Sequence, residues 1–323
     1  MNQRPFPAGR DRPFRPLDGA GPRLLAAAAG ILCLTSAASG AGVVTEGDRT
    51  WAAAALREEQ SLPARAAPNT VGVLYFHNRT GDAALDPLQK GLALLLVTDL
   101  SAVRGLQVVE RVRLQALVEE LGLGKTGLVE EGSGPRVGRL LGARWLVGGI
   151  LTSPAPAAVR AEPRVLDVPQ GVPTGLPGAE GELAEFFRVQ KDLLFQILGF
   201  LEVRLTPSEE RRLRRPCTRS LAALLDLSRA VGASDAGDYG GAAAYYESAL
   251  REDPGVCLAG DALRDLRRRG LVSPRAEAGE LLESLRSSTS LTDALTPKDA
   301  LRRGAPAAGT RSVPVEVRID FPQ

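Results

Sequence analysis

An alternation of short apolar runs and amphipathic segments between residues 70 and 151 constrains the fold of this chain most. Three apolar runs, enriched in β-branched residues, predict buried strands at Val71–Phe76, Leu106–Val109 and Trp145–Leu151. Leucines spaced three and four apart predict helices between these strands, one after Asp86-Pro87, one ending at Gly122, and a short one at Arg136–Leu141. The resulting order βαβααβ indicates helices packed on a sheet.

The same pattern continues to residue 215. Val159–Val168 predicts a fourth strand, and Pro163 within it is typical of an edge strand. The Gly- and Pro-rich stretch Gln170–Gly181 predicts a loop, and the broad apolar face of Glu182–Gly199 predicts a helix. Thr206–Glu209 is a capping box that opens a further helix. We therefore expect an α/β fold with a mixed sheet flanked by helices in the order βαβααββα.

This ordered set of segments resembles the CsgG-like family, which includes the curli secretion channel and periplasmic domains of the flagellar FlgO type. The motifs that carry the resemblance are Val71–Phe76 followed by Asn78 and Gly81, then Val108–Arg111, Leu117–Leu121, Leu141–Ala143, Leu146–Gly149, Arg164–Asp167 and Phe186–Leu193. They cover roughly residues 70 to 213. The resemblance implies a non-enzymatic component of envelope assembly or secretion, with other envelope or secretion-apparatus proteins as partners. The ring-forming relatives make a homo-oligomer one assembly to test.

The first 40 residues have the pattern of a secretory signal peptide. Arg23 precedes the apolar run Leu24–Leu34, and the small residues of Thr35–Gly40 follow it, with cleavage expected after Ala38 or Gly40. This address predicts the periplasm, or the periplasmic face of the outer membrane, of a Gram-negative cell. Cys33 leaves a lipid anchor open as an alternative, although Leu32 stands where lipoprotein signals need a small residue. A disordered alanine-rich arm is the third interpretation.

A membrane channel would require additional strands. The architecture of the curli channel inserts two membrane-spanning β-hairpins, each needing about 20 residues of alternating pattern. Thr152–Ala158 is too short for such a hairpin, and Pro169–Gly181 shows no alternation. The sequence therefore favours an accessory protein, and a lipidated outer-membrane channel subunit is kept as the alternative.

The remaining segments organise the chain into further units. Residues 41–69 predict a linker with a short helix at Trp51–Glu59, and residues 216–286 predict a helical unit. Within that unit Gly237–Pro254 looks like the second helix of a tetratricopeptide repeat, serving either peptide binding or structural helix pairing. Residues 287–312 predict a second linker. The alternation in residues 313–323 predicts a half-buried strand, at the sheet edge or paired with a partner.

No segment predicts catalysis. Gly122–Gly127 spells G-x-G-x-x-G but follows a helix, whereas a dinucleotide fingerprint must follow a strand. Glu119 stands where a phosphate loop needs glycine, so a nucleotide-binding enzyme is only the second alternative. His77 is the single histidine, and one imidazole cannot build a zinc site. Glu110-Arg111 predicts a structural ion pair at a strand end, with a catalytic carboxylate and its electrophilic partner as the alternative. We expect no catalytic, cofactor-binding or metal-binding residues.

Charge and cysteine content complete the prediction. A net charge of +2 argues against a strongly basic nucleic-acid footprint, and aromatic residues make up 4%, too few for base-stacking platforms. Cys217 and Cys257 precede successive predicted helices that would lie side by side. In an oxidising periplasm they could form a disulfide, and two buried thiols are the alternative.

Overall fold

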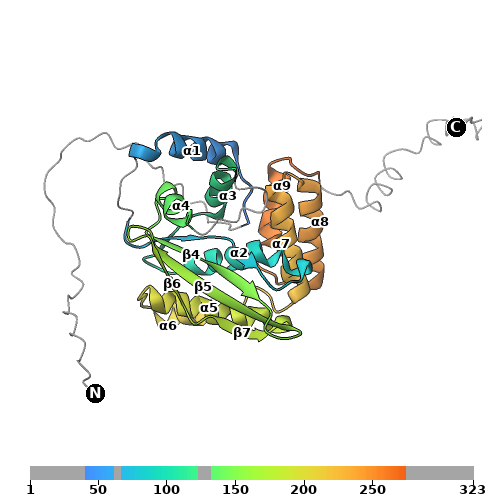
Figure 1. Cartoon of the computed structure of the whole chain (residues 1–323). Helices are drawn as coiled ribbons and strands as arrows, with labels where there is room; N and C mark the ends of the chain where they lie inside the picture. Colours follow the sequence, from blue (N-terminus) through green and yellow to red (C-terminus); the bar gives the residue numbers. More distant parts are fainter. Residues whose placement is uncertain (1–40, 62–66, 123–131, 274–323) are drawn as a thin grey trace, which may run out of the picture. The chain divides into compact units, whose positions relative to one another are not determined.

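A computed structural model describes residues 41–61, 67–122 and 132–273 of the 323-residue chain (Figure 1). The predicted signal peptide with Cys33, residues 123–127 of the glycine-rich motif, the linker at 287–312 and the strand at 313–323 lie outside the described residues.

The centre of the fold is a mixed sheet. Its strands are β1 (Thr70–Val73), β2 (His77–Asn78), β3 (Gln107–Val108), β4 (Trp145–Thr152), β5 (Ala158–Asp167), β6 (Val172–Gly175) and β7 (Ala179–Glu182). The main path runs β3-β1-β4-β5-β6, with β1 parallel to β3 and β4, and β5 antiparallel to β4. This confirms the mixed α/β fold, while β2, β6 and β7 are additional to the predicted order.

Helices cover both faces of the sheet (Figure 1). They are α1 (Glu46–Arg57), α2 (Leu88–Ser101), α3 (Arg111–Glu120), α4 (Gly134–Leu140), α5 (Phe186–Phe200) and α6 (Pro207–Leu213), with 3₁₀ turns η1 (Glu59–Ser61), η2 (Ala83–Leu85) and η3 (Leu183–Glu185). The connection from β1 to its neighbour β3 runs through α2. The connection from β3 to β4, which lies on the other side of β1, runs through α3 and α4. Right-handed crossovers in opposite directions place α2 and α3 on opposite faces.

The region around β5 differs from the sequence prediction. Gln170–Gly181, predicted as a loop, contains β6 and β7, which pair with the two ends of β5. Pro163 therefore lies in an interior strand, and its assignment to an edge was wrong. The Leu176 N–H donates to the Pro163 carbonyl at 3.1 Å, so the proline nitrogen faces the same side. On that side lies the gap between β6 and β7. No strand pairs with Pro163 there, so the missing backbone N–H costs β5 no hydrogen bond of the sheet.

Local signals set most helix ends. Gly122 has a φ of +68° directly beyond the end of α3, as a C-terminal cap requires. The N-cap of α2 is Pro87 instead of Asp86, whose carboxylate accepts a hydrogen bond from Asn78 Nδ2 at 2.7 Å. In the predicted linker at 41–69, Thr45 and Asp48 form a capping box that starts α1.

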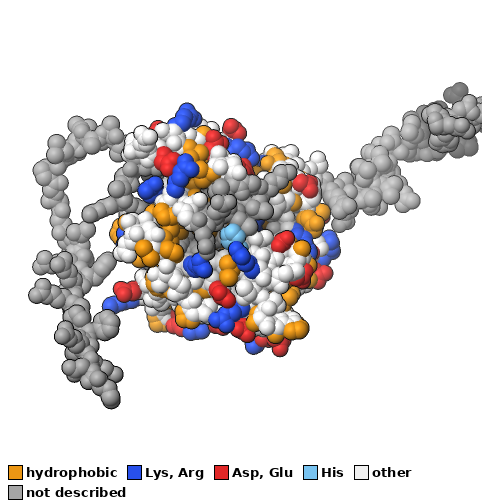
Figure 2. All heavy atoms as spheres, viewed as in Figure 1, with side chains coloured by type: hydrophobic (Ala, Val, Ile, Leu, Met, Phe, Trp, Pro, Cys, Tyr) orange, Lys and Arg blue, Asp and Glu red, His pale blue; other side chains and the backbone are white. Residues whose placement is uncertain are grey.

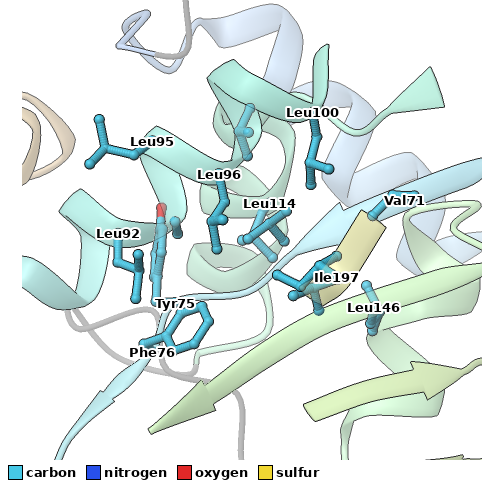
Figure 3. Packing of buried hydrophobic residues seen from close by; sticks show 14 of the residues in the cluster. Val71, Tyr75, Phe76, Leu92, Leu95, Leu96, Leu100, Leu114, Leu146 and Ile197 are labelled. Carbon is cyan, nitrogen blue, oxygen red and sulfur yellow. The ribbon is translucent and has the colours of Figure 1, made fainter. Parts of the chain in front are cut away.

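The main core includes buried residues of the sheet, of α2 and α5, and of α3 and α4. Figure 3 shows Tyr75 and Phe76 beyond the end of β1 beside leucines of α2, with Val71, Leu146 and Ile197 farther along the sheet. Helix α2 is apolar around most of its circumference because it touches the sheet, α5 and the helical unit. On its α5 side, Asp99 accepts hydrogen bonds from Gln190 Nε2 and Lys191 Nζ at 2.8 and 2.7 Å. Burial raises the pKa of Asp99 despite the attraction of Lys191.

The helical unit consists of α7 (Leu221–Asp235), α8 (Tyr239–Glu252) and α9 (Ala259–Arg268). Its own core includes Leu227, Tyr246 and Leu263, and residues from elsewhere join it: Ala41, Val43 and Leu94. Ala230, Ala242 and Ala249 are fully buried and allow close helix packing. The tetratricopeptide likeness of this unit stays a prediction. None of the helices in the described residues is long and apolar enough to cross a membrane.

Close packing of α2 on α7 gives a first prediction. A Cβ on Gly91 would lie 2.0 Å from Ser228 Oγ and 3.0 Å from Ser228 Cβ. We expect Gly91→Ala to lower the free energy of unfolding by about 1–3 kcal/mol, because the extra methyl overpacks this contact. Gly232→Ala in α7 is the matched control, since a Cβ there meets no atom within 4 Å. It should instead stabilise the protein by up to about 1 kcal/mol. Urea unfolding of both variants measures this, and equal stabilisation would refute the tight contact.

Glu209 gives a pH-dependent prediction. Hydrogen bonds from the Thr206 side chain, and then from the backbone N–H groups of Thr206 and Arg104, lower the pKa of Glu209 to about 2. The stabilisation from this depressed pKa is complete above the ordinary value of 4.5 and is lost as the pH falls toward 2. We expect Glu209→Gln to be less stable than wild type at pH 6 and nearly equal at pH 2. Urea unfolding at both values tests this, with Glu210→Gln as control. A stability difference that does not change with pH would contradict it.

Candidate functional site

The strand ends of the parallel part of the sheet carry the candidate site. Tyr75 lies two residues beyond β1, and Arg111 begins α3 just after β3. In open α/β sheets ligands bind in the crevice outside the carboxyl ends of the strands, where the crossovers diverge to opposite faces. Here Asp235, the last residue of α7, occupies that position.

Arg111 is the centre of a buried charge cluster, defined here as Tyr75, Lys90, Arg111, Gln115 and Asp235. The Arg111 side chain is 1% exposed, and its Nη1 lies 2.9 Å from both carboxylate oxygens of Asp235. Its Nη2 donates to the Gly42 carbonyl at 2.8 Å. One guanidinium thus joins the α/β domain to the helical unit and to the segment that precedes α1.

The other members complete the hydrogen bonding. Lys90 Nζ lies 2.7 Å from Asp235 Oδ2 and 5.2 Å from the centre of the Tyr75 ring. Tyr75 donates its hydroxyl hydrogen to Gln115 Oε1 at 2.8 Å, and Arg111 Nη1 lies 3.3 Å from that hydroxyl. Asp235 is therefore matched by two cations, as a buried carboxylate requires.

Burial and charge act on these groups in different directions. Burial raises the pKa of Tyr75, so its hydroxyl stays protonated and can donate. Burial opposes the charge of Arg111, but the attraction of Asp235 and the Tyr75 hydroxyl outweighs it and raises the pKa of Arg111. The cluster is thus a fixed ion pair with a neutral phenol, which suits a structural joint better than proton transfer.

A cavity of about 600 Å³ adjoins the cluster. It is lined by the start of α2, one side of α3 and the end of α7: Asp86, Pro87, Gln89, Lys90, Gln115, Glu119, Gly122, Ser228, Arg229, Gly232, Asp235 and Ala236. Its charged groups are engaged, because Arg229 lies 2.9 Å from Asp226 and Glu119 accepts from Gln115 Nε2 at 2.9 Å. The cavity can receive a small ligand or side chains of a partner.

The predicted site residues fall in different places. The ion pair expected within Glu110-Arg111 is replaced by Arg111–Asp235, a pair 124 residues apart in the chain, while Glu110 is exposed. His77 lies in β2, half-buried at the surface that Figure 2 shows. Gly122 caps α3 and lines the cavity. Among the described residues, no group of three His, Cys, Asp or Glu side chains could hold a metal ion.

The two cysteines lie at the base of the helical unit. The structure joins Cys217 and Cys257 by a disulfide, with their Cα atoms 5.0 Å apart, and the Cys257 N–H donates to the Cys217 carbonyl at 3.2 Å. Their oxidation in the cell stays a prediction, which thiol analysis tests.

Sequence reasoning did not identify the charge cluster. Arg111 was noticed only with its neighbour, and Lys90, Gln115 and Asp235 each stand in helical patterns as ordinary polar residues. The one available signal was an arginine placed directly after an apolar strand, which does not name its partner.

Comparison with known proteins gives one finding. Residues 52–153 match the family model of the curli production assembly/transport component CsgG. No curated protein and no solved structure matches the chain. The match runs from within α1 to the end of β4 and includes Tyr75, Lys90 and Arg111, whereas Asp235 lies outside it. It supports the CsgG-like resemblance over these residues.

Proposed function

We propose that this chain is a non-enzymatic accessory protein of the cell envelope, which acts in the periplasm or at the periplasmic face of the outer membrane. It would assist assembly or secretion of a surface structure through protein–protein contacts. The observation that carries the proposal is the family match over residues 52–153. The predicted signal peptide at residues 1–40 agrees with it.

The geometry of the site supports a binding role. Lys90 and Arg111 join α2 and α3 to α7 through Asp235, and Glu119 accepts a hydrogen bond from Gln115 within α3. Such a network fixes the helical unit on the α/β domain and keeps the shape of the cavity constant. A rigid, partly apolar cavity of about 600 Å³ fits side chains of a partner protein.

The experiment is fractionation of native cells with mass analysis of the mature amino terminus. We expect a chain that begins near Ala41 and is recovered from the periplasm or with outer-membrane proteins. A diacylglyceryl group on Cys33 would instead favour the lipidated channel subunit. An uncleaved cytoplasmic chain would overturn the envelope assignment.

The nucleotide-binding alternative is tested separately. Equilibrium binding of ATP and NAD to the purified chain should show no saturable site. Saturable binding that is lost on replacing Lys125 would favour an enzyme that uses the Gly122–Gly127 motif.

A further inference from the structure

An excess of positive charge surrounds α6. The α6 surface is defined here as Glu202–Arg219 together with Arg104. Seven arginines in it are exposed: Arg104, Arg204, Arg211, Arg212, Arg214, Arg215 and Arg219. The carboxylates in it are Glu202, Glu209 and Glu210, and Glu209 is buried. An excess of four positive charges is therefore concentrated here, although the whole chain has a net charge of only +2.

Contacts within the fold place these arginines together. Arg104 lies beside α6, because its backbone N–H donates to Glu209 at 3.0 Å. Arg212 donates to the Ala102 carbonyl on the same side. Arg211, Arg214 and Arg215 stand three and four positions apart and share the outer side of the helix and its end.

Most of these cations lack a carboxylate. Within the part of the chain that the structure describes, no Asp or Glu lies within salt-bridge distance of Arg204, Arg211, Arg215 or Arg219, and Arg214 alone pairs, with Glu210 at 2.6 Å. Helix α9 is equally rich in arginine but differs. There Arg264 pairs with Asp261, and Arg268 and Arg269 pair with Asp265. The two segments thus share a high arginine content, but carboxylates neutralise much of it on α9 and little of it around α6.

We propose that the α6 surface binds anionic phospholipid headgroups and holds the protein against a membrane surface. Guanidinium groups match phosphate oxygens in geometry and charge. Arg211 and Arg212 lie in the short helix α6, the other arginines lie before it, after it or beside it, and no residue of α6 lines the large cavity. Exposed arginines spread over a helix and its flanking segments can meet several phosphates at once on an anionic membrane surface.

The proposal goes beyond the envelope function, and vesicle binding can fail while the envelope assignment stands. The test is co-sedimentation of the purified chain, as the cells process it, with phosphatidylglycerol–phosphatidylcholine vesicles and with phosphatidylcholine vesicles. The readout is the ratio of the two partition coefficients. We expect strong preference for the anionic vesicles at about 0.05 M salt and its loss at about 0.5 M, where charges are screened.

Two triple variants test the position of the charge. Arg204→Gln, Arg211→Gln and Arg215→Gln together should lower binding to anionic vesicles about 100-fold, since each arginine contributes roughly fivefold. The matched control, Arg264→Gln, Arg268→Gln and Arg269→Gln, changes the net charge equally and should lower it less than about threefold. Unchanged thermal unfolding shows that both variants are folded.

Three results would overturn the proposal. Equal losses in the two variants would mean that only net charge matters. Equal binding to neutral and anionic vesicles would mean that an anchor outside the α6 surface carries the chain. Selective binding of poly-glutamate by the α6 surface, with no vesicle binding, would assign it to an acidic protein instead.

Discussion

Arg111→Met should lower the free energy of unfolding by about 3–5 kcal/mol, because it leaves Asp235 buried with half of its partners removed. The Asp235 side chain is 3% exposed, so its carboxylate loses a partner where little solvent reaches it. Lys90 Nζ remains 2.7 Å from Asp235 Oδ2. We therefore expect the loss of stability to lie toward the lower end of this range. Urea unfolding, read as a change in midpoint at constant slope, measures it.

Two comparisons make the result specific to the buried pair. Arg229→Gln removes a half-exposed pair with Asp226 on the same helix as Asp235 and should cost less than about 1 kcal/mol. Combining Arg111→Met with Asp235→Leu removes both charges of the pair and should destabilise the protein less than the sum of the two single variants. If Arg111→Met behaves like Arg229→Gln, or the double variant is additive, the cluster does not join the two parts of the protein as described.

Removing the disulfide should destabilise the protein by a similar amount. Cys217 and Cys257 are 40 residues apart, and closing a loop of this length stabilises a protein by about 4 kcal/mol in the chain-entropy model. We expect Cys217→Ala with Cys257→Ala to unfold at lower urea concentration than the oxidised wild type. The helical unit should be affected most, because the closed loop contains α7 and α8.

Reduction provides the control for that experiment. Dithiothreitol should shift the unfolding midpoint of the wild type toward that of the double variant and leave the variant unchanged. Thiol counting on protein taken freshly from its own compartment should find neither Cys217 nor Cys257 free. Two free thiols there, or a midpoint indifferent to dithiothreitol, would contradict the predicted bond.

The sequence itself determined the elements whose signals are local. The strands β1 and β4 and the helices α2, α5, α7 and α8 follow from apolar runs and from leucine or alanine spacing within single segments. Gly122 and the Thr206–Glu209 capping box mark helix ends through contacts that span a few residues. The local sequence alone therefore specifies them. Of these elements, the family match over residues 52–153 includes β1, α2 and β4.

Pairing between distant segments was decided by the tertiary structure. Val172–Gly175 has weak strand propensity and four exposed residues, and it forms β6 because β5 supplies the ladder. Pro163 is tolerated inside the sheet because its nitrogen faces a gap between two short strands. Neither fact can be seen in a window of neighbouring residues.

The charge cluster shows the same limit most clearly. Arg111 and Asp235 each look like ordinary surface residues in sequence, and burial without a partner would be prohibitive for either. They are stable in the core because the crossovers open a crevice at the strand ends and α7 ends inside it. Periodicity reports which face of a segment is buried, but only the packed chain determines which charges meet there.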